Sequence, residues 1–108
     1  MIFRAKRRYV LVRSSVPVDA VVSQYKLGES LLGLMGAEEY ANAMPKVVKQ
    51  IDDSTFILRV SRGSERKLVL ALSFIKSLGS ARLGFYTLRT SGSIAALLRK
   101  SGIMQKVP

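Results

Sequence analysis

Apolar and β-branched residues alternate with turn residues through much of the chain and predict several strands. Residues 8–14 (RYVLVRS), 46–51 (KVVKQI) and 55–61 (TFILRVS) have the composition of strands. Only residues 52–54 (DDS), a turn by composition, separate the last two, which predicts an antiparallel hairpin. Alternation in the third segment divides its side chains between two faces, with Phe56, Leu58 and Val60 on one and Thr55, Ile57, Arg59 and Ser61 on the other.

Between the first two predicted strands the spacing of apolar residues changes to that of a helix. Apolar side chains recur at intervals of three and four residues across residues 18–34. Gly36 is a suitable C-cap for this helix. Residues 37–44 are ambiguous between a helical turn and a loop, and Pro45 ends them.

The second half of the chain repeats this alternation of helix and strand. A stripe of apolar residues in 64–78 predicts a helix with Ser64 as N-cap and Gly79 as C-cap. Residues 82–90 (RLGFYTLRT) predict a fourth strand. After residues 91–93 (SGS) a short last helix is predicted, whose apolar face holds Ile94, Leu97 and Leu98.

The resulting order, β-α-β-β-α-β with an extra C-terminal helix, satisfies the ferredoxin-like split βαβ arrangement. This α+β fold has a four-stranded antiparallel sheet with two helices on one face. The 108 residues suit a single domain, and we expect residues 1–6 and 102–108 to be flexible. The same architecture serves RNA-recognition domains, ribosomal proteins, ligand sensors and acylphosphatases, so the fold alone does not decide the function.

Composition narrows the chemistry. The chain contains no cysteine and no histidine, which removes cysteine proteases, histidine-dependent hydrolases, zinc fingers and most transition-metal enzymes. No secretory signal is visible, and the longest apolar run, residues 68–72, is too short to span a bilayer. We therefore expect a cytoplasmic location and no membrane partner.

Charge is the most informative bulk property. The formal net charge is +11, and residues 55–108 hold ten basic side chains and one acidic, against eight and six in residues 1–54. A folded domain this small and basic indicates a polyanionic partner. Nucleic acid is favoured over membrane because no stretch combines a clean apolar face with a basic flank.

The residues offer little support for an enzyme of this fold. An acylphosphatase needs an Arg for phosphate and an Asn for water, but Asn42 is the only asparagine and lies in an uncertain connection. Asp52 and Asp53 could bind Mg²⁺, although an Asp pair between strands is more often a turn. Ser93 and Lys100 would lie about 10 Å apart along a helix and could not form a Ser–Lys pair.

RNA binding by base stacking is also weakly supported. Residues 83–86 (LGFY) resemble the stacking motif of RNA-recognition domains only in part, and aromatic residues make up 7% of the chain. Whichever of Phe85 and Tyr86 faces the helices is expected to be core. Contacts from Arg and Lys to phosphates are therefore the expected mode of binding.

The best cationic cluster comprises Arg59, Arg62, Arg66 and Lys67, at a strand end and the first turn of the next helix. An ordinary solvated face, or pairing of Arg62 with Glu65, is the alternative. Residues 91–93 beside Arg89 suggest a second phosphate cradle, with a plain N-cap as the alternative.

Three segments carry a family resemblance: residues 8–12 (RYVLV), residues 57–65 (ILRVSRGSE), and residues 88–94 (LRTSGSI) with 98–100 (LRK). In this order they resemble ribonuclease P protein component 2 of archaea, related to a eukaryotic subunit shared by ribonucleases P and MRP. Residues 28–44 match only in hydrophobic rhythm. The candidate RNA-binding residues are Arg7, Arg8, Arg59, Arg62, Arg66, Lys67, Arg89, Ser91, Ser93, Arg99 and Lys100.

The resemblance implies an RNA-recognition-like fold without the stacking motif. It implies a subunit that assists the ribonuclease P RNA in removing the 5′ leader of precursor tRNA, with the chemistry and the Mg²⁺ ions held by the RNA and no cofactor or catalytic residue in the protein. Ribonuclease P protein component 3 is the implied partner, as a heterodimer or heterotetramer, with self-association possible. Apolar surface on the first and last predicted helices would meet component 3 or a second copy of this chain. Another structured-RNA binder, such as a ribosomal protein, is the alternative, and an acylphosphatase-like enzyme is the alternative from another class.

Overall fold

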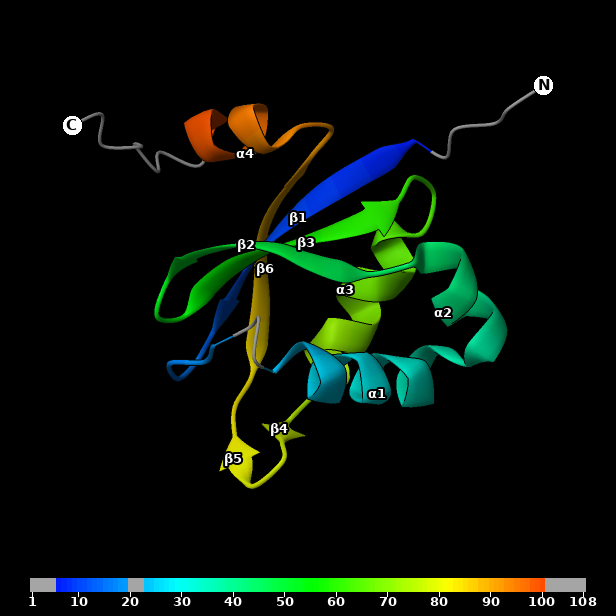
Figure 1. Cartoon of the computed structure of the whole chain (residues 1–108), viewed down its shortest axis with the longest axis vertical. Coiled ribbons are helices and arrows are strands. Elements are labelled where there is room, and N and C mark those ends of the chain that lie inside the picture. The colour runs from blue at the N-terminus through cyan, green and yellow to red at the C-terminus, as the bar shows by residue number, and fades with distance from the viewer. Residues whose placement is uncertain (1–5, 20–22, 101–108) are drawn as a thin grey trace.

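Four antiparallel strands form the central sheet in the computed structural model, which describes residues 6–19 and 23–100 (Figure 1). The order across the sheet is β2 (Lys46–Asp52), β3 (Thr55–Ser61), β1 (Arg7–Ser14) and β6 (Phe85–Ser91). Helices link β1 to β2 and β3 to β6, while the short turn at residues 53–54 links β2 to β3. This is the predicted ferredoxin-like split βαβ arrangement.

Three helices cover one face of the sheet: α1 (Gln24–Met35), α2 (Ala37–Ala43) and α3 (Glu65–Phe74). The predicted alternation in β3 is confirmed, because Phe56, Leu58 and Val60 lie in the core beneath these helices. The rings of Phe56 and Phe85 meet edge to face, with centroids 5.8 Å apart. The main core is thus built from one face of the sheet and the apolar stripes of α1 and α3.

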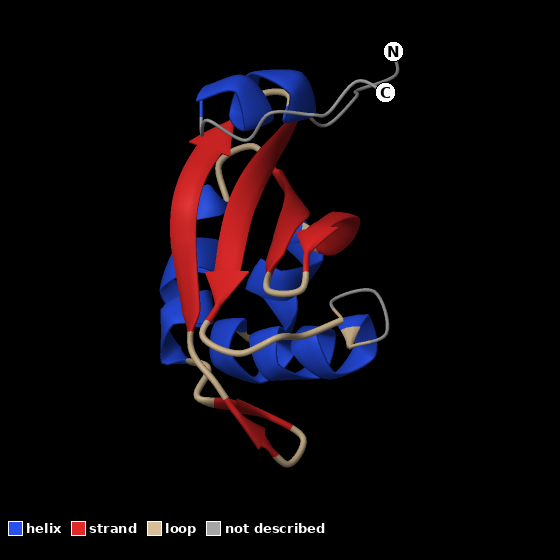
Figure 2. Cartoon of the chain, turned by 90° about the vertical axis from the view of Figure 1, so that its left-hand side faces the viewer, coloured by secondary structure: helices blue, strands red, loops and turns tan. Residues whose placement is uncertain are grey.

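The opposite face carries a second, smaller core under the last helix, α4 (Ile94–Lys100). Leu97 and Leu98 pack on Leu11 and Ile57, and Leu11, Ile57 and Leu97 are fully buried. Figure 2 shows α4 at one end of the sheet, beyond the strands. The predicted last helix is confirmed, but its apolar face is used within the chain, so the expectation that it meets a partner is wrong for these residues.

The first half of the chain differs from prediction at the start of α1. Val18 is not helical, because its N–H donates to the carbonyl oxygen of Asp53 in the β2–β3 turn at 2.7 Å. Within the described residues the helix begins at Gln24, and residues 20–22 lie outside them. The ambiguous segment after Gly36 is helix α2, and its C-cap is Met44, which lies in the left-handed region with φ +46°.

The largest departure lies after α3, where the predicted helix to residue 78 is wrong. The helix ends at Phe74, and the chain continues as a small hairpin, β4 (Ser77–Leu78) and β5 (Ala81–Arg82). Ile75 and Leu78 still reach the main core, but from extended backbone. An apolar side chain in this segment can therefore be buried without helical geometry, which the periodicity could not reveal.

Gly79, with φ +61°, turns this hairpin instead of capping a helix. The predicted fourth strand is correspondingly divided, because Leu83 and Gly84 interrupt it between β5 and β6. Gly84 is held at the end of β1, where its N–H donates to Ser15 Oγ at 2.8 Å. The expectation of flexible ends concerns mostly residues 1–5 and 102–108, which lie outside the described residues; Lys6 is described, and its carbonyl oxygen accepts from Arg62 N at 2.8 Å.

Candidate nucleic-acid interface

One cross-strand row at the start of β1 brings polar side chains of all four long strands together. Tyr9 lies opposite Arg59 of β3 and opposite Ser91 of β6, and Arg59 lies opposite Lys46 of β2. Residues directly opposite in antiparallel strands share one face of the sheet. Since Ile57 and Leu11 of this face pack under α4, the row lies on the face that carries α4.

Further cations lie next to this row, at the end of the sheet and in the segment that follows β3. Arg7 is exposed opposite Ser61, the last residue of β3. Arg62 follows in the β3–α3 loop, and Arg66 lies in the first turn of α3. We call the following group the strand-end surface: Arg7, Lys46, Arg59, Arg62 and Arg66. All are exposed except Arg59, which is half-buried.

The loop that carries Arg62 is fixed through its backbone, which leaves the side chain outside. Besides the bond from Arg62 N to Lys6, Ser64 N donates to Ser61 O at 3.1 Å. Gly63 has φ +98°, a conformation that favours glycine, and its N–H donates to a carboxylate oxygen of Glu65. Ser64 occupies the predicted N-cap position but makes no side-chain capping bond. Among the described residues, Arg62 and Arg66 form no ion pair.

Glu65 pairs with Arg8 of β1, so the alternative that it pairs with Arg62 is wrong. Arg8 Nε lies 3.3 Å from Glu65 Oε2, and the two side chains are 35% and 24% exposed. A Cβ added at Gly92, before α4, would lie 3.6 Å from Arg8 Nη1. Arg8 therefore lies between the beginnings of α3 and α4, where one acid neutralises much of its charge.

Lys67 separates from the other predicted cations. Its Nζ lies 2.7 Å from Glu39 Oε1 of α2. Adjacent helical residues are rotated by about 100° from each other, so Lys67 and Arg66 serve different sides of α3. Lys67 lies beside a small apolar groove lined by Leu34 and Phe74.

At the other candidate cradle, Ser93 is an N-cap. Its Oγ accepts a hydrogen bond from Ala96 N at 3.1 Å, which is the plain capping alternative. Ser91 is buried at the end of β6, while Arg89 is exposed on that strand. Arg99 and Lys100 are exposed in the last turn of α4, where the helix dipole stabilises positive charge.

Lys46 and Tyr9 were not predicted from the sequence as members of the candidate interface. Both join it through strand register alone, which gives no local signal in the sequence. The sequence correctly predicted one aromatic residue of the fourth strand in the core, since Phe85 is buried and Tyr86 is 58% exposed. Because α4 covers Leu11 and Ile57 in the middle of this face, the sheet does not present a central pair of aromatics for stacking.

The carboxylates of the β2–β3 turn serve the backbone. Asp52 Oδ1 accepts a hydrogen bond from Ser54 N at 2.9 Å, and this bond holds the pKa of the Asp52 carboxyl below its usual value. Within residues 6–19 and 23–100, no group of three potential metal-ligating side chains gathers. No helix in this described part is long and apolar enough to cross a membrane.

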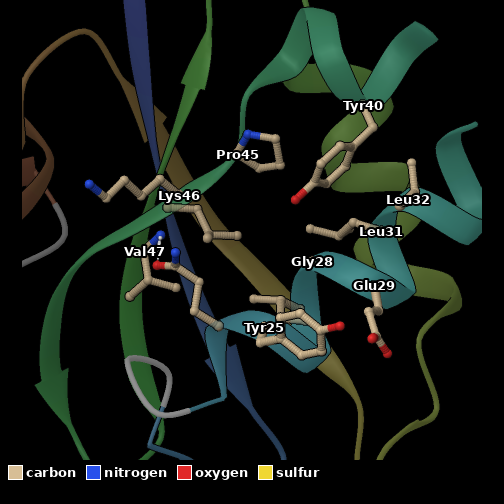
Figure 3. A pocket seen from close by; sticks show the side chains of 12 residues that line it. Tyr25, Gly28, Glu29, Leu31, Leu32, Tyr40, Pro45, Lys46 and Val47 are labelled. Carbon is tan, nitrogen blue, oxygen red and sulfur yellow. Dashed lines mark hydrogen bonds between the residues drawn. The ribbon is translucent and has the colours of Figure 1, made fainter. Parts of the chain in front are cut away.

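A hollow of about 550 Å³ lies between α1, α2 and the start of β2 (Figure 3). Tyr25 lies on its rim with Glu29, whose hydrogen bond raises the pKa of the Tyr25 hydroxyl. The Tyr40 hydroxyl lies over Gly28, where a Cβ would be only 2.9 Å from that oxygen. A phenol of raised pKa stays protonated at neutral pH, so the Tyr25 hydroxyl does not serve as a base in this hollow.

Comparison with known proteins finds similarity over most of the chain. The family model described as "Rpp14/Pop5 family" matches residues 8–101. The chain is 38% identical over 100 residues to "Ribonuclease P protein component 2" of Methanosphaerula palustris, covering 90% of this chain and 62% of the relative's length. It is 32% identical over 109 residues to the protein of the same name from Methanoculleus marisnigri, covering 97% of this chain and 67% of that one.

The fold also has a counterpart among solved structures. A chain in the cryo-EM structure of yeast ribonuclease MRP superposes with a TM-score of 0.61 at 12% sequence identity. The match covers 86% of this chain and 79% of the yeast chain. At that identity the likeness concerns the fold alone.

Proposed function

Because the chain belongs to the Rpp14/Pop5 family, we propose that it is a protein subunit of ribonuclease P. The observation that carries the proposal is the match over residues 8–101, together with relatives named ribonuclease P protein component 2. The chain spans only 62% of the length of the first of these relatives, so the activity of the whole assembly is part of the proposal. Its substrate is precursor tRNA, from which the 5′ leader is removed.

The strand-end surface supports electrostatic binding to the ribonuclease P RNA. Its members come from three strands, a loop and a helix, and the formal charge of the chain is +11. Each phosphate contact releases condensed counterions and contributes roughly 0.7–0.9 to the salt slope of binding. By neutralising phosphates, the protein stabilises the folded RNA with its substrate at lower Mg²⁺ concentration.

We assign the bond-breaking step to the RNA and the Mg²⁺ ions that it holds. The role of the protein residues is to bind phosphates, and none of them is assigned a catalytic step. Three carboxylates support that division, since Asp52 binds the turn backbone, Glu65 binds Arg8 and Glu39 binds Lys67.

The proposed protein partner is ribonuclease P protein component 3, in a heterodimer or heterotetramer. Exposed apolar side chains on the helical layer support a protein contact there, since Leu34 is 48% exposed and Phe74 is 59% exposed. The proposed contact includes α1 but not α4, because the apolar face of α4 is buried in the second core.

The test is cleavage of a precursor tRNA by the cognate ribonuclease P RNA at limiting Mg²⁺, with and without this chain. The partner subunit is present in both arms, because the proposed assembly contains both proteins. Leader removal that appears only when this chain is added supports the proposal. No increase in cleavage, with the partner folded and bound, would overturn it.

A further inference from the structure

A basic hairpin projects from the end of the molecule opposite to α4 (Figures 1 and 2). It consists of β4 and β5 and is anchored at its base, where Leu78 and Leu83 are both 7% exposed in the main core. Leu83 N also donates to the Lys76 carbonyl oxygen at 3.0 Å. A fixed base therefore supports an exposed tip of small residues, Ser77, Gly79, Ser80 and Ala81.

Three cations surround this tip, and we call Lys26, Lys76 and Arg82 the hairpin cluster. Arg82 lies opposite Ser77, and Lys76 is the residue immediately before Ser77. Lys26 comes from α1, and its Nζ would lie only 2.8 Å from a Cβ at Gly79. The lysine stem thus lies against the turn because residue 79 has no side chain.

The charges of the hairpin cluster are not neutralised within the described part of the chain. All three residues are exposed. Among residues 6–19 and 23–100 none of them forms an ion pair, since the two ion pairs found there use Arg8 and Lys67. Like charges gathered in this way repel one another, and a polyanion removes that repulsion.

The chemistry of the tip favours RNA phosphates over other anionic partners. Nucleic-acid complexes use Arg, Lys and Ser side chains to contact phosphate and sugar. The tip offers these groups in the hairpin cluster and in the hydroxyls of Ser77 and Ser80. The tip carries no large apolar side chain to enter a lipid surface. It also lacks the aromatic anchor that dominates protein–protein contacts.

The hairpin cluster is electrostatically separate from the strand-end surface. Arg66 of the strand-end surface lies in the first turn of α3, and Lys76 of the hairpin cluster follows the last turn, so the length of this ten-residue helix, about 15 Å, separates them. At physiological ionic strength, charges are screened over about 8 Å. Phosphates held at one end therefore do not neutralise the cations at the other.

We propose that the hairpin cluster is a second phosphate-binding surface, so that the protein bridges two separate backbone segments of its RNA. The inference rests on the proposed function for the identity of that RNA. It adds a second contact region to the strand-end surface. The charge distribution along the sequence does not predict this region, because the fold brings Lys26 from the first half of the chain to Lys76 and Arg82 from the second.

The first test measures binding of the full chain to the ribonuclease P RNA across a salt series. The triple variant Lys26→Ala, Lys76→Ala, Arg82→Ala should flatten the salt slope by roughly two to three units, about 0.9 for each duplex phosphate that the variant no longer binds. The matched control, Lys26→Arg, Lys76→Arg, Arg82→Lys, keeps the charge and should keep the slope. Lys76→Ala alone, a single exposed change, should flatten it by about one unit. A wild-type slope in the triple and single variants would overturn the proposal.

The second test asks whether two RNA segments are contacted. The chain has no cysteine, so Ser80→Cys and Ser61→Cys each give one attachment point for an iron chelate that cleaves nearby RNA. Ser80 is exposed at the hairpin tip, and Ser61, which is half-buried, lies opposite Arg7 in the strand-end surface. Cleavage at different nucleotides supports bridging, while no cleavage from residue 80, or the same nucleotides from both, would overturn it.

The two proposals fail in distinguishable ways. If the wild-type chain stimulates leader removal but the triple variant binds RNA as the wild type does, only the hairpin inference is wrong. If the wild-type chain neither binds the ribonuclease P RNA nor stimulates cleavage, the proposed function is wrong, and the hairpin inference is overturned with it.

Discussion

Arg8 and Glu65 form an ion pair between the central strand β1 and the first turn of α3, with Nε 3.3 Å from Oε2. Glu65 is the only acidic residue in the second half of the chain. Glu65 lies at the edge of the strand-end surface, where its carboxylate also accepts a hydrogen bond from the backbone N–H of Gly63. The pair fixes the loop that carries Arg62 and at the same time reduces the positive charge nearby.

Glu65→Gln should therefore change stability and RNA binding in opposite directions. The change removes the ion-pair partner of Arg8 and a negative charge that the dipole of α3 stabilises. It should lower the free energy of unfolding by about 1 kcal/mol, because solvent reaches both side chains and weakens the pair. The net charge rises by one, so RNA affinity at low salt should rise. Urea unfolding and a binding titration measure the two effects.

Asp53→Asn is the matched control for Glu65→Gln, because it removes one acid from an exposed turn. It should leave the free energy of unfolding within about 0.5 kcal/mol of the wild type. If Glu65→Gln were as stable as this control, the Arg8–Glu65 pair would have no structural role.

Arg62→Ala combined with Arg66→Ala should weaken RNA binding about equally for different sequences. Both side chains are exposed and lack a described acidic partner, so they are available to phosphates. The salt slope should flatten by roughly 0.7–0.9 for each phosphate that is no longer bound. An unchanged slope would remove both residues from the interface.

Lys67→Ala should have a smaller effect on the salt slope than Arg66→Ala, although the residues are adjacent. Glu39 already neutralises Lys67 at 2.7 Å, and the pair lies toward α2. Comparison of the two single variants in the same salt series measures this. Equal effects would return Lys67 to the strand-end surface.

Leu97→Ala should lower the free energy of unfolding by about 2–4 kcal/mol. The side chain is fully buried between α4 and the sheet, so truncation leaves a cavity against Leu11 and Ile57. Leu70→Ala makes the same substitution in α3, where the side chain is 59% exposed. It should cost much less in the same urea experiment, and equal costs would show that the second core contributes little.

Two glycines should respond to alanine with opposite signs. Gly33 lies within α1 with nothing within 4 Å of an added Cβ, so Gly33→Ala should stabilise the fold by about 0.5–1 kcal/mol. Gly63 also has open space, but its φ is +98°, so Gly63→Ala should destabilise by about 1–2 kcal/mol. Thermal unfolding of both variants checks the signs, and the same sign in both would contradict the backbone argument.

Asp52 should make part of the stability depend on acid pH. The hydrogen bond from Ser54 N lowers the pKa of Asp52, with help from Thr55 and the charge of Arg13. A carboxyl whose pKa is lower in the folded state stabilises the fold above the unfolded pKa of about 4, and this is lost as the pH falls through the folded value. Unfolding at pH 3–6 should show a smaller loss in acid for Asp52→Asn than for the wild type. Parallel profiles would contradict this.

The strands were predictable because their signal is local. Residues 46–51 and 55–61 were predicted almost as they occur in β2 and β3, and alternation placed Phe56 and Ile57 on opposite faces. Helix lengths were less predictable, because apolar spacing does not distinguish a helical residue from an extended one that reaches the same core. Ile75 and Leu78 are the examples, and the hairpin after α3 was missed for this reason.

The candidate interface was predicted in part. Arg59, Arg62 and Arg66 are close in sequence and stay on one end of the fold. Lys46 joins them only through the register of β2 with β3. Lys67, their immediate neighbour in sequence, is diverted to Glu39 because a helix turns adjacent residues to different sides.

The sequence by itself determined the fold class, the basic character of the chain and the resemblance in residues 57–65 and 88–94, because alternation, composition and short motifs are local properties. The tertiary structure decided which charges act together. In the folded chain Lys26 lies against Gly79, and Glu65 forms its ion pair with Arg8 rather than with Arg62. These pairings depend on strand register and helix packing, which bring distant residues within contact distance and leave no trace in the spacing of residues along the chain.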